Sequence, residues 1–115
     1  MGAPINLKTK LLFLCSRNQW RSPTAEELFR DHPRYEARSA GTVDGARVKL
    51  TAGHIGWADV IFCMEKKHAS TVTERFSAEL GDKPLITLRI PDDYHYMDPE
   101  LIELLRSELS NHVDL

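Results

Sequence analysis

Residues 10–22 of this chain, KLLFLCSRNQWRS, decide how its first part folds. The run 10–15 is short, continuous and apolar, which is typical of a central strand buried on both faces of a parallel sheet. A polar loop follows at once. Pro23, with Glu26 and Glu27 shortly after it, indicates that a helix begins there, because proline and acidic residues favour the first turn of a helix. The stretch therefore predicts a strand, a tight loop and a helix N-terminus in direct succession.

The rest of the chain alternates short apolar runs with segments of helical spacing. We expect three further strands, at residues 35–39, 59–64 and 84–88. We expect three further helices, at residues 51–57, at residues 65–80 and after the Asp98–Pro99 cap. Strands that alternate with helices predict an α/β fold, an open, doubly wound parallel sheet of about four strands with helices on both faces. A length of 115 residues suits a single domain over residues 1–115.

Composition narrows the function classes. The formal net charge is −2 at pH 7, so the chain has no general attraction to nucleic acid or to an anionic membrane, and any anion binding must be local. The two cysteines, Cys15 and Cys63, are expected to be free thiols of a cytoplasmic protein. No apolar run is long enough to span a membrane, and no coiled-coil pattern demands a partner, so we expect a monomer.

The loop after the first strand has the chemistry of an anion site. Cys15 and Arg21, with five residues between them, lie between a buried strand and a helix N-terminus. Backbone N–H groups in such a turn form a concave nest, and the helix adds about half a positive charge. Arg21 can donate two hydrogen bonds to phosphate, and the same field favours the thiolate of Cys15. The loop therefore predicts a nucleophile for phosphoryl groups. The alternative is a buried structural cysteine beside a surface arginine.

Residues 12–23, LFLCSRNQWRSP, resemble the N-terminal signature of the low-molecular-weight protein tyrosine phosphatases. The resemblance continues in family order through four shorter segments, Ala25-Glu26, SAGT at 39–42, DVIFCME at 59–65 and IPD at 90–92. It implies the fold of that family. It also implies metal-independent and cofactor-free hydrolysis of phosphate monoesters, on phosphotyrosine proteins or on small molecules, through a phosphocysteine intermediate.

The resemblance also implies roles for residues of the loop. Cys15 would be the nucleophile, Arg21 would clamp the phosphate, and Ser22 would stabilise the thiolate. Asn18 would hold the loop in shape, bonded to Ser39. The phosphate-binding loop would comprise Ser16, Arg17, Asn18, Gln19, Trp20 and Arg21.

Cleavage of a monoester needs an acid that protonates the leaving oxygen and a base that activates water, and one carboxyl group can do both in turn. The family takes this acid from a loop before the last helix, which residues 90–98 overlay. Asp92 then matches the acid, although the adjacent Asp93 replaces the usual proline and is the alternative. Asp98, directly before Pro99, is predicted to cap the last helix instead. Tyr94 is expected to flank the substrate ring.

Three departures from the family pattern bear on specificity. Arg17 stands where the family has glycine, so it would be strained if that position needs a positive φ. Trp20 replaces a second cysteine that can protect the nucleophile. The stretch 42–59, which normally forms one wall of the cleft, is short, so a more open pocket is expected. Trp20 or Trp57 could rebuild the wall, but we expect core packing for each.

Two other functions stay open. An arsenate reductase of the same fold would need further cysteines to relay a disulfide, and only Cys63 is present. A non-catalytic phosphate-binding module would also explain the altered loop. The histidines have no partners at metal-ligand spacing, so we expect no metal.

Overall fold

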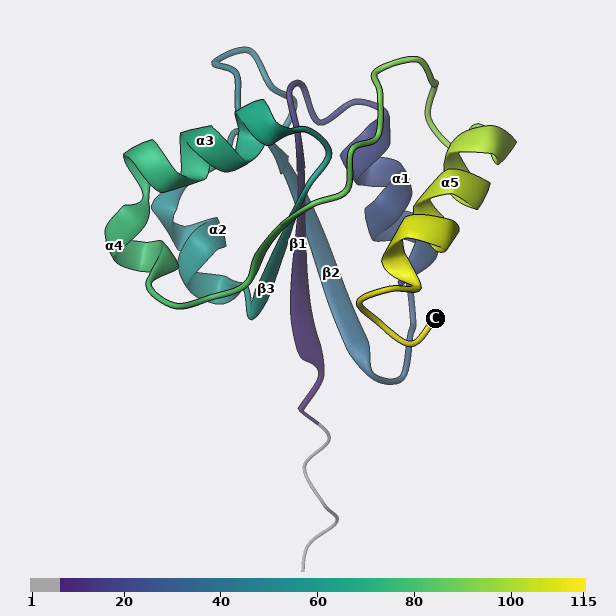
Figure 1. The fold of residues 1–115 in the computed structure, drawn as a ribbon, viewed down its shortest axis with the longest axis horizontal. Coiled ribbons are helices and arrows are strands. Elements are labelled where there is room, and N and C mark those ends of the chain that lie inside the picture. The colour runs from purple at the N-terminus through teal and green to yellow at the C-terminus, as the bar shows by residue number, and fades with distance from the viewer. Residues whose placement is uncertain (1–6) are drawn as a thin grey trace, which may run out of the picture.

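In the computed structural model, which describes residues 7–115, four strands form one parallel sheet in the order β2-β1-β3-β4 (Figure 1). The strands are β1 (Thr9–Cys15), β2 (Tyr35–Gly41), β3 (Val60–Cys63) and β4 (Leu85–Thr87). The helices are α1 (Arg21–Leu28), α2 (Ala52–Trp57), α3 (Lys66–Arg75), α4 (Ser77–Leu80) and α5 (Pro99–Leu109). All strand pairs are parallel, so the predicted open parallel α/β sheet is confirmed.

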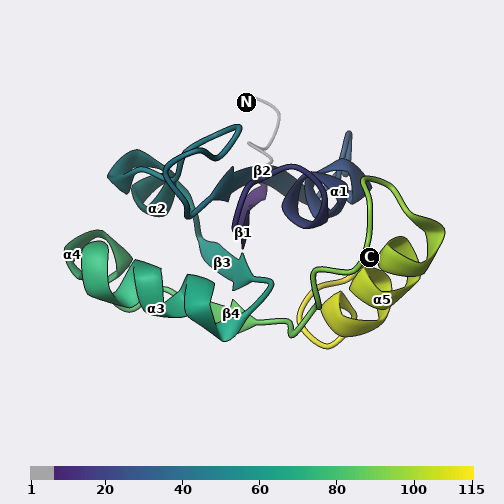
Figure 2. The ribbon, with the colours of Figure 1, turned by 90° about the horizontal axis from the view of Figure 1, so that it is seen from above.

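Helices cover both faces of the sheet, as Figure 2 shows from above: α1 and α5 lie on one side, and α2, α3 and α4 on the other. Side chains of β1 alternate between the two cores that result. Leu11, Phe13 and Cys15 belong to the core under α1 and α5, whereas Leu12 and Leu14 belong to the core under α2 and α3. This double burial explains why residues 10–15 are continuously apolar.

The structure corrects the expectation of one helix over residues 65–80. Phe76 has φ −130° and ψ 32°, which ends α3 and lets the short α4 start in a new direction. The side chain of Phe76 packs against the core on the α2 side, so tertiary packing outweighs a continuous helix there. The predicted caps are present: Asp98 accepts a hydrogen bond from the backbone N–H of Glu100 at 2.9 Å.

Strand order determines where the site can be. β1 lies between β2 and β3, so the loops after these three strands meet at one edge of the sheet. Main-chain hydrogen bonds also bring in the segment after β4, because Ile90 donates to Met64 at 2.8 Å, and Met64 donates to Leu14 at 2.9 Å. Ligands of parallel α/β folds bind at such an edge. Over residues 7–115, no helix is long and apolar enough to cross a membrane.

Candidate active site

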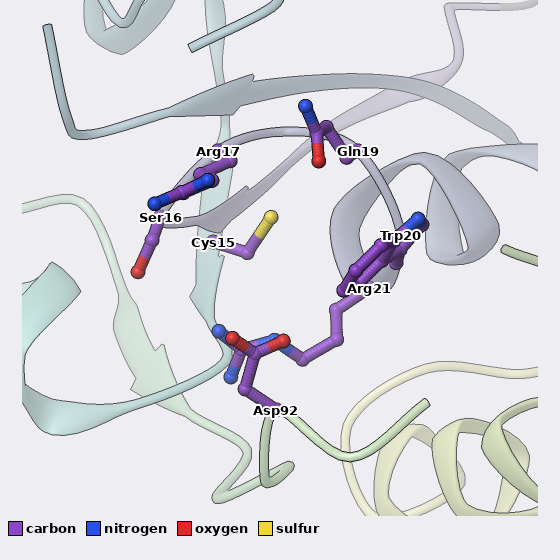
Figure 3. Close-up of a pocket in the computed structure, with 7 residues that line it drawn as sticks. All are labelled: Cys15, Ser16, Arg17, Gln19, Trp20, Arg21 and Asp92. Atoms are coloured by element: carbon purple, nitrogen blue, oxygen red, sulfur yellow. The ribbon is translucent and has the colours of Figure 1, made fainter. Parts of the chain in front are cut away.

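Cys15, the last residue of β1, lies in a cavity of about 180 Å³ at this edge of the sheet (Figure 3). The cavity is lined by Cys15, Ser16, Arg17, Gln19, Trp20, Arg21 and Asp92. Six of these seven residues come from the predicted phosphate-binding loop and its cysteine. The seventh, Asp92, comes from the segment that follows β4, far away in sequence.

The loop is fixed by a strap, residues 42–47, which runs along its outer side. The backbone carbonyls of Cys15, Ser16 and Arg17 accept hydrogen bonds from backbone N–H groups of the strap at 3.0, 3.1 and 3.0 Å. The carbonyl of Asn18 accepts from Nε of Arg47 at 2.9 Å. Four successive carbonyl groups of the loop are therefore directed away from the cavity.

The N–H groups of the loop are left for a ligand. In the described part of the chain, the backbone N–H groups of Ser16, Arg17, Gln19 and Trp20 donate no hydrogen bond, and α1 begins at Arg21. Free amides in a tight turn before a helix make a nest for an anion. The shape of the loop, and not only its composition, therefore favours phosphate.

Asn18 links the loop to the structure beneath it. Its φ is 56°, in the left-handed region that asparagine tolerates better than most residues. The strain considered for Arg17 is absent, because the left-handed residue of the loop is its neighbour. Nδ2 of Asn18 donates to Oγ of Ser22 at 2.9 Å and to Oγ of Ser39 at 2.8 Å, so the predicted bond to Ser39 is present.

The carboxylate of Glu26 and the amide group of Asn18 determine the direction of most hydrogen bonds in this network. A carboxylate only accepts, so the hydroxyl of Ser39 donates to Glu26, at 2.6 Å, and accepts from Asn18. The hydroxyl of Ser22 also accepts from Asn18, which leaves its proton for Sγ of Cys15, 2.9 Å away. The backbone N–H of Asn18 donates to the same sulfur at 3.2 Å. The N–H of Asn18 and the hydroxyl of Ser22 can therefore both donate to Cys15, which is the arrangement that stabilises a thiolate.

The guanidinium of Arg21, in a residue only 2% exposed, is held from behind. Its Nη1 donates to Oε2 of Glu65 at 2.8 Å and to the carbonyl of Ile90 at 2.7 Å. In the described residues, Nε and Nη2 make no hydrogen bond, and both can serve an anion in the cavity. Our sequence reasoning missed Glu65 and Ile90. The position of Glu65, directly after a buried strand, was the available signal.

Glu65 also joins Arg21 to α3. Burial would raise the pKa of Glu65, but the hydrogen bond and charge of Arg21 hold it below its ordinary value. Nδ1 of His68 accepts from the backbone N–H of Glu65 at 3.0 Å, so the ring proton is on Nε2, which donates to Oγ of Ser16 at 3.0 Å. Burial, and then the charge of Arg21, lowers the pKa of His68 to about 4. His68 is therefore a neutral, satisfied histidine that fixes Ser16.

The geometry separates the two acidic candidates. Oδ1 of Asp92 lies 3.6 Å from Nε of Arg21, and its carboxylate faces the cavity (Figure 3). The side chain is 58% exposed, so water can reach it. Asp93 is exposed and does not line the cavity. Of the neighbouring pair, only Asp92 is brought to Cys15.

Trp20 and Tyr94 lie at positions other than those expected from the sequence, whereas Trp57 lies where it was expected. Trp20 is not in the core: it is 39% exposed and lines the cavity, with its ring edge-on to His95 at 4.9 Å between centroids. Trp57 does pack against the core on the α2 side, under the guanidinium of Arg38. Tyr94 is half-buried against the other core and does not line the cavity. Trp20 takes the position that we had expected for Tyr94.

Cys63 cannot act together with Cys15. The two side chains belong to the cores on opposite faces of the sheet, and burial raises the pKa of Cys63 to about 12. Cys63 is therefore a core thiol. Among residues 7–115, no group of three His, Cys, Asp or Glu side chains could hold a metal ion.

No protein-family model matches the sequence, and no curated protein sequence matches it either. The fold and the cavity nevertheless define a class, the parallel α/β proteins with a cysteine at the base of a cavity in the loop after the first strand. Within this class, the fold is that of the low-molecular-weight protein tyrosine phosphatases, as three solved structures show.

The low-molecular-weight protein tyrosine phosphatase SP-PTP of Streptococcus pyogenes superposes with a TM-score of 0.72 at 18% identity, covering 92% of this chain and 94% of that one. The tyrosine phosphatase Wzb of Escherichia coli K30, in complex with phosphate, gives 0.69 at 21%, covering 91% and 96%. The YwlE arginine phosphatase of Geobacillus stearothermophilus gives 0.63 at 22%, covering 93% and 99%. The chain thus spans nearly the whole length of each.

Proposed function

We propose that this protein hydrolyses phosphate monoesters without a metal, through a phosphocysteine intermediate on Cys15. The observation that carries the proposal is the set of donors around one sulfur, in which Ser22 and the N–H of Asn18 bond to Cys15 beneath a nest of free amides. The likeness to solved tyrosine phosphatases supports it. The expected partner is a phosphorylated substrate.

The first step transfers the phosphoryl group to sulfur. The Cys15 thiolate attacks phosphorus, the bond between phosphorus and the leaving oxygen breaks, and Asp92 gives that oxygen its proton. Arg21 and the loop amides stabilise the charge on the three equatorial oxygens. The partly buried salt bridge of Arg21 to Glu65 holds its guanidinium in place for this task.

The second step regenerates the enzyme. Asp92, now a carboxylate, takes a proton from water, and the oxygen attacks the phosphocysteine. The bond between sulfur and phosphorus breaks, which releases inorganic phosphate and restores the thiolate. The exposure of Asp92 gives water a path to this position. One carboxyl group at the cavity mouth therefore suffices for both steps.

The cavity favours an aryl phosphate as substrate. The exposed ring of Trp20 forms one side of the cavity, where the ring of a phosphotyrosine can pack against it. Such aromatic pairs contribute about 0.5–1.5 kcal/mol. Because one of the similar structures is an arginine phosphatase, phosphoarginine is the second substrate to assay.

The test is hydrolysis of p-nitrophenyl phosphate without metal by the wild type and three variants. We expect Cys15→Ser to lose nearly all activity, and Asp92→Asn to lose about 10²–10⁴-fold in kcat because the leaving oxygen is not protonated. Asp93→Asn is the matched control and should retain activity. Unchanged activity of Cys15→Ser would overturn the mechanism, and a silent Asp92→Asn would remove Asp92 from its role.

The arrangement of cysteines counts against the arsenate reductase alternative. A disulfide relay needs a second thiol that can reach the nucleophile, and Cys63 lies across the sheet from Cys15. A non-catalytic phosphate-binding module would bind phosphate in the same loop, but it would turn over no substrate in the assay above.

A further inference from the structure

Arg17 is a cation at the mouth of the cavity, and its side chain has no partner in the described part of the chain. It is exposed and lines the cavity, and its side chain makes no hydrogen bond or ion pair within residues 7–115. Its main chain is held firmly, because its carbonyl accepts from the backbone N–H of Arg47 at 3.0 Å. A fixed backbone that carries a free guanidinium is suited to an incoming anion.

The other arginine of the cavity, Arg21, already forms a salt bridge within the protein. Arg21 pairs with the Glu65 carboxylate at 2.8 Å and lies 3.6 Å from Asp92, so its charge is offset by Glu65 before any phosphate binds. No carboxylate of residues 7–115 forms an ion pair with Arg17. The two arginines can therefore serve different groups: Arg21 the phosphoryl group within the loop, and Arg17 a further negative charge on the same ligand.

A groove beside the cavity also carries basic side chains. Figure 3 shows the Arg17 side chain on the Ser16 side of the cavity, across from Trp20. Ser16 also borders a neighbouring groove of about 400 Å³, to which α3 contributes Lys67 and Arg75. Lys67 lies 3.6 Å from Glu65, which it shares with Arg21. The acidic residue in that groove, Asp44, is paired with Lys49 at 3.0 Å, whereas Arg75 has no ion pair within the described residues.

We propose that Arg17 is a specificity residue that binds a second anionic group of the substrate, and that the substrate is a phosphotyrosine peptide with acidic residues next to the phosphotyrosine. The aromatic ring packs on Trp20, and the acidic neighbour extends over Ser16 toward Arg17 and the basic groove. A peptide is favoured over a small molecule because the groove offers more room than the cavity itself. The inference rests on the proposed function for the location of the phosphoryl group.

The test measures binding, so it does not depend on turnover. Two peptides carry a non-hydrolysable phosphonate analogue of phosphotyrosine, flanked by Glu in one and by Gln in the other. We expect the wild type to bind the Glu peptide about three- to fivefold more tightly by calorimetry, as an exposed ion pair allows, and to lose this preference at high salt. Arg17→Gln should reduce the ratio of the two Kd values to about one, and Arg17→Lys should keep part of it.

Arg106→Gln, which removes an equal charge from the exposed face of α5, is the matched control and should keep the wild-type ratio. Equal Kd values of the wild type for the two peptides would overturn the inference. So would an Arg17→Gln variant that loses the same factor of affinity for both peptides. If a small aryl phosphonate with a carboxylate shows the same Arg17-dependent gain as the peptide, the claim for a peptide is wrong. Failure of the proposed function would appear separately, as absence of p-nitrophenyl phosphate hydrolysis.

Discussion

Asn18 illustrates how much of the site depends on one side chain. It adopts a left-handed conformation and donates two hydrogen bonds, and it is completely buried. We expect Asn18→Ala to lower the free energy of unfolding by about 2–3 kcal/mol, because two buried hydroxyl groups lose their donor and alanine is strained at positive φ. We expect kcat to fall as well, since Ser22 is no longer oriented toward Cys15. Urea unfolding and steady-state kinetics measure the two effects.

The control for this prediction is Asn111→Ala, at an exposed position after α5, which should change neither quantity measurably. Ser39→Ala should fall between the two, because it removes the bonds of Ser39 to Asn18 and to Glu26 but leaves the bond from Asn18 to Ser22. A wild-type kcat in Asn18→Ala would show that the strap alone holds the loop.

At this scale, the sequence predicted the residues that are close in the chain. Cys15, Asn18, Arg21 and Ser22 lie within one strand–loop–helix unit, so local pattern and resemblance were enough to group them. The partners of Arg21, by contrast, are 44 and 69 residues away. Contacts over such distances depend on strand order, which local periodicity does not encode.

At the level of single elements, the start of α3 is a pH-sensitive cap. In the unfolded chain, His68 has its ordinary pKa of about 6.5 and takes up a proton as the pH falls below that value. In the folded protein its pKa is about 4, so it takes up the proton only near pH 4. Between these values the unfolded state binds more protons, so stability rises with pH and falls as the solution is acidified. We expect acidification from pH 7 to 4 to cost about 2–3 kcal/mol through His68, measured by urea unfolding at each pH.

His68→Asn should flatten this dependence, because asparagine does not titrate. His54→Asn is the matched control, since His54 holds the equivalent position in the cap of α2 but is half-exposed, and its effect should be smaller. Glu65 does not blur the comparison above about pH 5, because its contribution is lost only between its ordinary pKa of 4.5 and its lowered native pKa. Parallel pH profiles of the wild type and His68→Asn would contradict the prediction.

Elements themselves were largely predictable, and their ends and breaks were less so. The apolar runs and the Asp98–Pro99 cap located the strands and α5, because these signals are local. The break at Phe76 and the exposure of Trp20, by contrast, depend on contacts with residues that are distant in the sequence. The chain leaves the helical conformation at Phe76, whose side chain packs against the α2-side core. The ring of Trp20 packs against His95, which lies 75 residues later in the sequence.

At the scale of the whole molecule, the sheet separates the two thiols. We expect iodoacetamide to label Cys15 and not Cys63 in the folded protein, because Cys63 is buried and its pKa is raised to about 12. Both should react in urea. Mass spectrometry after mild peroxide treatment should show oxygen added at Cys15 and no intramolecular disulfide, and such a disulfide would contradict the opposite placement of the side chains.

The strap affects which residues of such a protein can be replaced in evolution without disturbing the phosphate loop. Three of its four contacts with the phosphate loop come from main-chain N–H groups, and the fourth from the side chain of Arg47. Its backbone is constrained, and Gly41 just before it has no room for a Cβ, which would lie 2.6 Å from the Ser16 carbonyl oxygen. Its residues 43–45 are exposed, and the only one of them whose side chain forms an ion pair within residues 7–115 is Asp44, with Lys49. New substrate ranges could therefore arise by substitution or grafting in residues 43–45, while the loop that does the chemistry keeps its shape.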